Sequence, residues 1–260
     1  MWEFSNDDIK AKIAAMDSIG AAIREKIEKI KAEDYTSSKN IELWHVGKFL
    51  YHEADYTIEA VSESPDFILK GKGKKVGVEL SVMVDDGQKQ IESFKKSLVK
   101  AAVEIFKKRY NTEDFLANVY LKKDHYLFSK QQVPEVASKI ADEIYCFYCD
   151  ENIDPETTVF VEDVIRCPAQ FLDFDYNPGA YMVQVLTMEH LYEVISKKEK
   201  LIDSYRKSEC DEYWLLIVTD NGSSESFFVA EELLNTLNIN CDFERVYLME
   251  DFKNNLYRLI

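Results

Sequence analysis

The chain has 260 residues, of which 46% are hydrophobic and 31% charged, an ordinary composition for a globular protein with a sizeable core. The net charge of −16 argues against a nonspecific nucleic-acid binder, because phosphate neutralisation needs Lys and Arg side chains. No stretch approaches the roughly 18 uncharged apolar residues of a membrane span, and the first residues lack the basic start of a signal peptide, so we expect a cytoplasmic protein with no membrane partner.

The first predicted element is a long amphipathic helix over residues 6–33. Its apolar positions alternate at spacings of four and three residues: Ile9, Ile13, Met16, Gly20, Ile23, Ile27 and Ile30. This pattern is the seam of a coiled coil, so one alternative is a homodimer through this helix. The other is a helix docked on its own domain, which we favour because three heptads are short for an autonomous coiled coil.

A mixture of helices and strands follows this helix. We expect helices at 40–52, 88–110, 133–148, 189–207 and 226–238, and strands at 55–61, 115–121, 157–166, 170–187, 212–218 and 245–249. The run at 212–218 is continuously apolar, which is typical of a central strand buried on both faces. The pattern predicts an α/β fold with a mixed sheet flanked by helices, in which residues 1–39 form the helix and a linker and residues 40–260 form one domain.

The sequence pattern of residues 64–81 predicts a β-hairpin that carries two carboxylates. Its turn contains two glycines, and the register that this turn sets places Leu69 opposite Val76 and Asp66 opposite Glu79. One face of the hairpin is then wholly apolar, with Phe67, Leu69, Val76, Val78 and Leu80. On the other face, directly opposed residues have Cβ atoms about 4.5–5.5 Å apart, so the two acids destabilise each other unless something compensates their charge. A divalent cation is the usual compensation.

Positive charge is concentrated around this hairpin and the helix after it. Residues 70–109 contain eleven Lys or Arg side chains and five Asp or Glu side chains. Such a local field steers a polyanion even when the whole molecule is acidic. The candidates for contact with a nucleic-acid backbone are Lys72, Lys74, Lys75, Lys95, Lys96 and Lys100. A solvated, lysine-rich helix face is the alternative interpretation.

The order helix, strand, hairpin with Pro65-Asp66 and Glu79-Leu80-Ser81, long helix and strand resembles the PD-(D/E)xK nuclease superfamily, which has the restriction-endonuclease-like fold. The resemblance covers residues 40–122, the expected core of the domain. The lysine-rich helix that leads into the apolar run at 212–218 is also similar to a feature of some members. The resemblance implies that Asp66 and Glu79 hold Mg²⁺ or Mn²⁺.

The resemblance further implies a divalent-metal-dependent phosphodiesterase that cleaves nucleic acid, with the carboxylate-held cation activating water. Members of this family carry a lysine two residues after the glutamate. In this chain Ser81 occupies that position. Lys95, Lys96 and Lys100 on the following helix are candidates to replace that lysine, and Glu63 and Glu42 are candidates for the extra acid of some members. The predicted catalytic set is therefore Asp66, Glu79, Ser81 and Glu63. The alternative is an inactive protein of this fold that serves as a binding or regulatory module.

Overall fold

The structure is a computed structural model that describes residues 6–28, 30, 36–122, 129, 131–150, 152–179, 183–221, 224–230 and 239–260. The chain divides into two compact units: unit 1 comprises Met1–Val84 and Val183–Ile260, and unit 2 comprises Asp85–Met182. The predicted domain over 40–260 takes in parts of both, and whether they fold as one domain stays a prediction. Within the described ranges, no helix has the length and apolar character needed to cross a membrane.

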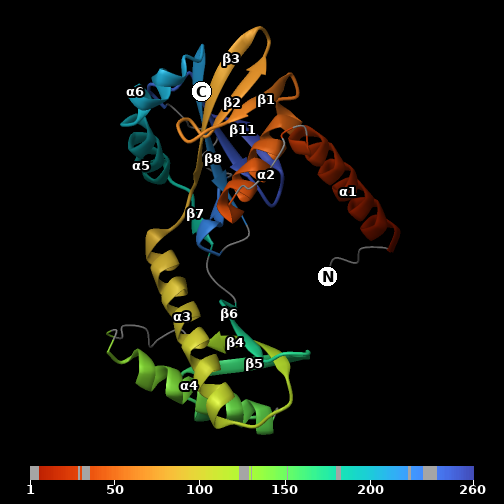
Figure 1. Ribbon diagram of the computed structural model, residues 1–260, viewed down its shortest axis with the longest axis vertical. Coiled ribbons are helices and arrows are strands. Elements are labelled where there is room, and N and C mark those ends of the chain that lie inside the picture. The colour runs from red at the N-terminus through yellow and green to blue at the C-terminus, as the bar shows by residue number, and fades with distance from the viewer. Residues whose placement is uncertain are drawn as a thin grey trace. The chain divides into compact units, whose positions relative to one another are not determined.

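Unit 1 is built around a mixed, six-stranded sheet (Figure 1). Its strands lie in the order β1 (Tyr56–Val61), β2 (Phe67–Gly71), β3 (Lys74–Val82), β8 (Glu212–Thr219), β10 (Arg245–Glu250) and β11 (Asn255–Arg258). Strand β8 runs parallel to β3 and to β10, and the other neighbours are antiparallel. The predicted α/β fold with a mixed sheet is therefore confirmed. So is the central place of β8, which is buried along almost its whole length.

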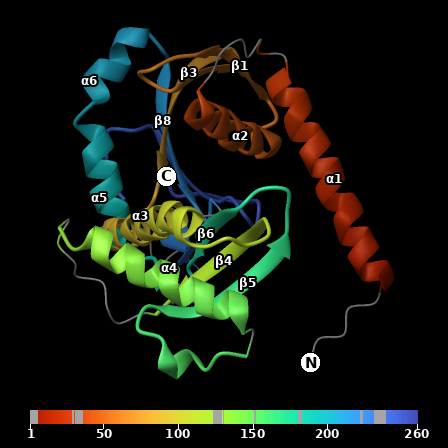
Figure 2. The ribbon, with the colours of Figure 1, turned by 60° about the horizontal axis from the view of Figure 1, so that its bottom comes forward.

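Helices cover both faces of this sheet (Figure 1, Figure 2). Helix α2 (Ser37–His52) packs on the face that carries Val76, Val78 and Leu80. The opposite face packs against α5 (Met188–Glu199) and α6 (Ile202–Tyr205). The helix predicted over 189–207 is thus two helices separated at Lys200 and Leu201, followed by a 3-10 turn at Arg206–Ser208.

The N-terminal helix α1 (Asn6–Glu28) packs along α2. Ile23 is only 1% exposed, and a Cβ atom added to Gly47 would lie 2.9 Å from the Cγ2 atom of Ile23 and 3.0 Å from that of Ile27. Part of the predicted seam therefore docks on its own chain, which supports the favoured alternative, and the homodimer stays a prediction. Of the predicted helix 6–33, residues 29 and 31–33 lie outside the described residues.

Unit 2 contains a three-stranded sheet in the order β5 (Val161–Pro168), β4 (Phe115–Leu121) and β6 (Asp173–Asn177). Helices α3 (Asp86–Arg109) and α4 (Val133–Cys149) pack against it to form one hydrophobic core (Figure 2). The predicted strand at 115–121 exists, but it lies in this sheet and not beside the hairpin, where the neighbour of β3 is β8. The burial patterns explain the difference: β4 alternates buried and exposed residues, which suits a sheet covered on one face, whereas β8 is buried on both.

Three predicted elements differ in their extent. The strand expected at 157–166 begins at residue 161, after a 3-10 turn at Pro155–Thr157. The strand expected over 170–187 is represented by β6 and by the short β7 (Gln184–Val185). The helix expected over 226–238 is contradicted at its start, where a 3-10 turn at Ser224–Ser226 leads into β9 (Phe228–Val229), paired with β7; residues 231–238 lie outside the described residues.

Candidate functional site

The hairpin of β2 and β3 has the predicted register. Leu69 lies opposite Val76, and Phe67 lies opposite Val78. The same register places Asp66, which directly precedes β2, opposite Glu79. The apolar face is buried against α2, so Glu79 points to the other face of the sheet, because side chains alternate along a strand.

Asp66 is held by the backbone of the neighbouring strand. Its Oδ2 atom accepts a hydrogen bond of 2.9 Å from the Leu80 amide. Its Oδ1 atom accepts one of 3.3 Å from the ammonium group of Lys39, which lies in the first turn of α2. Burial opposes the charged form of Lys39, but its bonds to Glu42 and Asp66 raise the pKa of Lys39 above its ordinary value. The Asp66 carboxylate is thus fixed from two sides.

Glu79 is a buried carboxylate, with 6% of its surface exposed. Its Oε1 atom accepts a hydrogen bond of 2.6 Å from Lys198, and its Oε2 atom is buried. Burial and the charge of Asp66 raise the pKa of Glu79, whereas Lys198 and a hydrogen bond from Tyr205 work in the opposite direction. The Glu79 carboxylate is therefore contacted by both a lysine and a tyrosine.

Lys198 reaches Glu79 because of its place on α5. Leu191 and Ile195 on the same helix are buried in the core of unit 1, and residues three and four apart share a helix face, so Lys198 lies on the face directed at the sheet. Lys198 is not among the site residues predicted from the sequence. The signal that could have found it was the lysine-rich helix leading into β8.

Tyr205 lies close to Glu79. Its hydroxyl is buried and interacts with the Glu79 carboxylate. Burial, the negative charge of Glu79, a hydrogen bond to Glu79 and the charge of Asp66 raise the pKa of Tyr205 above its ordinary value. The buried Glu79 carboxylate is thus contacted by a lysine and by a tyrosine hydroxyl, in keeping with the rule that buried polar groups have hydrogen-bonding partners.

The other predicted catalytic residues differ in their positions. Ser81 follows Glu79 on the same face of β3, is half-buried, and lines a cavity with Lys198. Glu63 is exposed in the segment before Pro65, and no contact between described residues joins it to Asp66 or Glu79.

The three lysines predicted at the hairpin turn lie away from the carboxylates. Lys74 is five positions from Glu79 along β3, a distance of about 17 Å. Lys72 pairs with Asp55 at 2.9 Å, and Lys74 pairs with Glu212. The ammonium group of Lys75 donates to the Ser208 carbonyl at 3.3 Å. The lysines at the site are instead Lys39 and Lys198.

The lysines predicted on α3 belong to unit 2. Lys95 is buried, with its ammonium group 5.6 Å from the centre of the Tyr176 ring. Lys96 lies 3.9 Å from Glu92, and Lys100 is exposed. The lysines that contact Asp66 and Glu79 are Lys39 and Lys198, which both belong to unit 1.

A cavity of about 290 Å³ lies next to the two carboxylates. We call it the notch, because it forms where β3 continues past the start of β2. It is lined by Ser38, Ile41, Glu42 and His45 of α2, by Leu80, Ser81 and Val82 of β3, and by Lys198.

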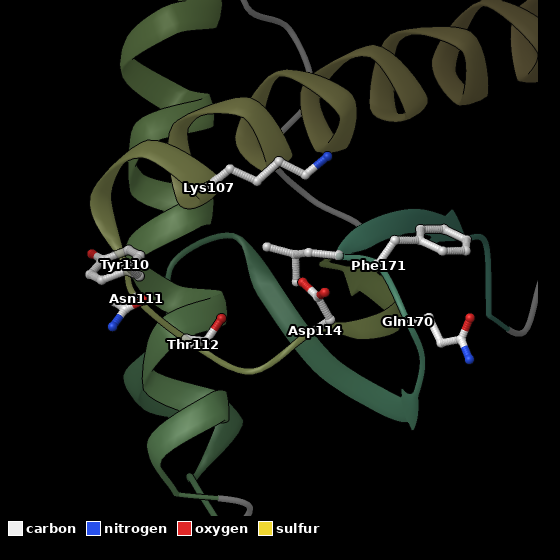
Figure 3. A pocket seen from close by; sticks show the side chains of 8 residues that line it. Lys107, Tyr110, Asn111, Thr112, Asp114, Gln170 and Phe171 are labelled. Atoms are coloured by element: carbon white, nitrogen blue, oxygen red, sulfur yellow. The ribbon is translucent and has the colours of Figure 1, made fainter.

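Unit 2 has a larger cavity of about 410 Å³ (Figure 3). Lys107 extends from the last turn of α3, and Phe171 lies on the segment that leads into β6. Of the residues that line it, only Lys107 and Asp114 are charged, and each lining residue is exposed or half-buried. It has neither opposed carboxylates nor a buried titratable group, so the carboxylate site of unit 1 is the better candidate.

The chemistry of the carboxylate site limits the metal it could hold. No group of three or more His, Cys, Asp or Glu side chains in the described ranges is arranged to bind a metal ion. Asp66 and Glu79 are a pair. A pair fits Mg²⁺, which commonly uses one or two carboxylates and completes its shell with water and substrate phosphate.

No protein-family model matches the chain, and neither a curated protein nor a solved structure is significantly similar to it.

Proposed function

We propose that unit 1 is a divalent-metal-dependent phosphodiesterase of the PD-(D/E)xK type that cleaves nucleic acid. The observation that carries the proposal is the pair Asp66 and Glu79, with the Lys198 ammonium group 2.6 Å from the Oε1 atom of the buried Glu79. An aspartate and a glutamate of the hairpin thus lie at one site with a lysine of α5.

The order of elements supports the same proposal. Helix α2 and strand β1 precede the hairpin, and the lysine-rich helix α5 leads into β8, which runs parallel to β3. These elements supply the helix, strand, hairpin, helix and strand of the resemblance. In this arrangement α5 and β8 take the part first expected of α3 and β4, and unit 2 lies between β3 and β7 in the chain.

Asp66 and Glu79 would hold the cation. When bound, a divalent cation polarises a phosphoryl oxygen and lowers the pKa of a coordinated water. The Leu80 amide keeps Asp66 in place, and rigid strands hold such geometry better than loops do.

Lys198 supplies the positive charge that the family places two residues after the glutamate. Its ammonium group lies at Glu79 and lines the notch, where it would stabilise negative charge that develops on the phosphate in the transition state. Lys39, on α2, donates a hydrogen bond to Asp66. Ser81, half-buried at the edge of the notch, is positioned to contact the substrate rather than to replace a lysine.

The ion pairs themselves favour the second candidate function, a binding module without catalysis. Lys39 pairs with Asp66 at 3.3 Å and Lys198 with Glu79 at 2.6 Å. These two ammonium groups already compensate the opposed carboxylates, which is the task that the sequence alone assigned to a cation.

Cleavage assays separate the two functions. The purified chain is incubated with plasmid, single-stranded DNA and RNA, with Mg²⁺, Mn²⁺ or a chelator. We expect metal-dependent cleavage that is lost in Asp66→Asn and Glu79→Gln, and that falls by about 10²–10³-fold in Lys198→Met, because one charge-stabilising group is removed. Glu63→Gln is the matched control and should cleave like the wild type. Cleavage that survives in both Asp66→Asn and Glu79→Gln, or no cleavage with any substrate, would leave the binding module as the better account.

A further inference from the structure

The notch beside the carboxylates has the size and walls of a pocket for a small planar group. Its volume of about 290 Å³ is at the lower end for ligand pockets. Ile41, Leu80 and Val82 give it aliphatic walls. It lies at the end of the hairpin that carries Asp66, so a group bound there would be close to anything held by the carboxylates.

Helix α2 supplies two residues with hydrogen-bond acceptors to the wall of the notch. Glu42 and His45 are three residues apart and so share a face of the helix, and both line the notch. Glu42 is negatively charged and partly exposed, with Lys39 at 2.8 Å from its Oε2 atom.

His45 adds an acceptor that no other described residue uses. The residue is 2% exposed, and in the described residues its Nδ1 atom has no hydrogen-bond partner. Its Nε2 atom faces the Asp251 carboxylate at 3.7 Å, and Asp251 is held by Lys48 at 2.8 Å. Burial lowers the pKa of His45, against the attraction of Asp251, so the imidazole is neutral near pH 7. A proton on Nε2, toward the carboxylate, leaves Nδ1 as an acceptor.

The notch and the carboxylate site share side chains. The Lys39 ammonium group lies 2.8 Å from Glu42 at the notch and 3.3 Å from Asp66. Lys198 lines the notch and binds Glu79. A single nucleotide could therefore place its phosphate at the carboxylates and its base in the notch.

We propose that the notch receives an unpaired nucleobase of the substrate and prefers guanine; this inference rests on the proposed function. The acceptors on Glu42 and His45 require neighbouring donors on the ligand. Guanine carries adjacent donors at N1 and N2, whereas adenine and cytosine carry one amino group beside a ring acceptor, and uracil and thymine carry one N–H between two carbonyls. Enzymes that read an extruded or single-stranded base do so through such edge contacts.

The test measures base binding separately from cleavage. Calorimetry of the full chain, in a chelator and without metal, compares guanosine monophosphate with adenosine monophosphate. We expect guanosine monophosphate to bind at least about tenfold more tightly, as a good bidentate contact provides. Glu42→Gln and His45→Gln should each reduce this preference to less than about threefold, and the matched control Glu59→Gln, on the exposed part of β1, should keep it. Melting curves establish that both variants are folded, and Glu42→Gln alone suffices if His45→Gln unfolds.

The outcomes separate the inference from the proposed function. If the wild type binds guanosine monophosphate preferentially but cleaves no substrate, the result supports the assignment of the notch as a guanine site and counts against the phosphodiesterase activity. Cleavage with equal binding of the two nucleotides, or a guanosine preference that Glu42→Gln leaves unchanged, overturns the notch assignment and leaves the phosphodiesterase standing.

Discussion

At the scale of single residues, the site is defined by a carboxylate in a costly position. Glu79 is buried opposite Asp66, a second carboxylate. A buried charge beside a like charge lowers stability, and such groups concentrate at functional sites. Lys198 compensates the charge of Glu79 in part.

This position predicts a pH-dependent effect of Glu79→Gln on stability. Because burial and Asp66 raise the pKa of Glu79 above the value of 4.5 in the unfolded chain, the folded protein binds this proton more tightly. The stabilising effect of this proton is complete below pH 4.5 and is lost as the pH rises through the pKa of Glu79 in the folded protein. The free energy of unfolding of Glu79→Gln, relative to wild type, should therefore increase from pH 4.5 upward in a chelator.

Urea unfolding at a series of pH values measures this difference. Glu63→Gln, in an exposed position, is the control and should give a flat profile. If the difference in the free energy of unfolding between Glu79→Gln and the wild type stays constant or decreases as the pH rises, then the folded protein does not disfavour the charged form of Glu79.

At the scale of elements, the position of Asp66 in the hairpin depends on Gly77, a glycine on the facing strand β3. A Cβ atom added to Gly77 would lie 2.7 Å from the Cγ atom of Pro65 and 2.9 Å from the Cδ1 atom of Tyr213. Both neighbours are rings with little freedom to move. Gly77 therefore lets Pro65 pack on β3, and Asp66 is the next residue.

Substitution of Gly77 should disable the site without touching a carboxylate. We expect Gly77→Ala to lower stability by about 1–3 kcal/mol through overpacking, and to reduce cleavage by about 10²-fold, since a shift of about 1 Å in a positioned group has that effect. The control is Gly73→Asn at the turn of the same hairpin, where φ is +74° and the added Cβ meets no atom within 4 Å, a conformation that Asn tolerates. Gly77→Ala with unchanged cleavage would mean that Asp66 does not depend on this packing.

At the scale of the whole molecule, the local patterns predicted more than the long-range arrangement. The hairpin register follows from its turn glycines and apolar alternation, and the central place of β8 follows from its continuous apolar run. The neighbour of β3 did not follow, because a parallel partner is separated from it by more than a hundred residues of chain, including all of unit 2. The next strand in the chain, β4, pairs with β5 and β6 in the other sheet.

The same reason limits what the sequence predicted of the site. Asp66 and Glu79 meet through a hairpin, so local spacing was enough to pair them. Lys198 and Tyr205 come from helices that are far along the chain and reach Glu79 only once β8 is in place. The candidates chosen for the missing lysine were those nearest in sequence, and they lie on α3 in unit 2.

A calorimetric titration of the metal-free chain with Mn²⁺ tests most directly whether Asp66 and Glu79 form a metal site. We expect one binding site in the wild type, weakened by at least about tenfold in Asp66→Asn and in Glu79→Gln, and unchanged in Glu63→Gln. No binding by the wild type, or equal binding by Asp66→Asn and the wild type, would contradict a metal site between these two carboxylates.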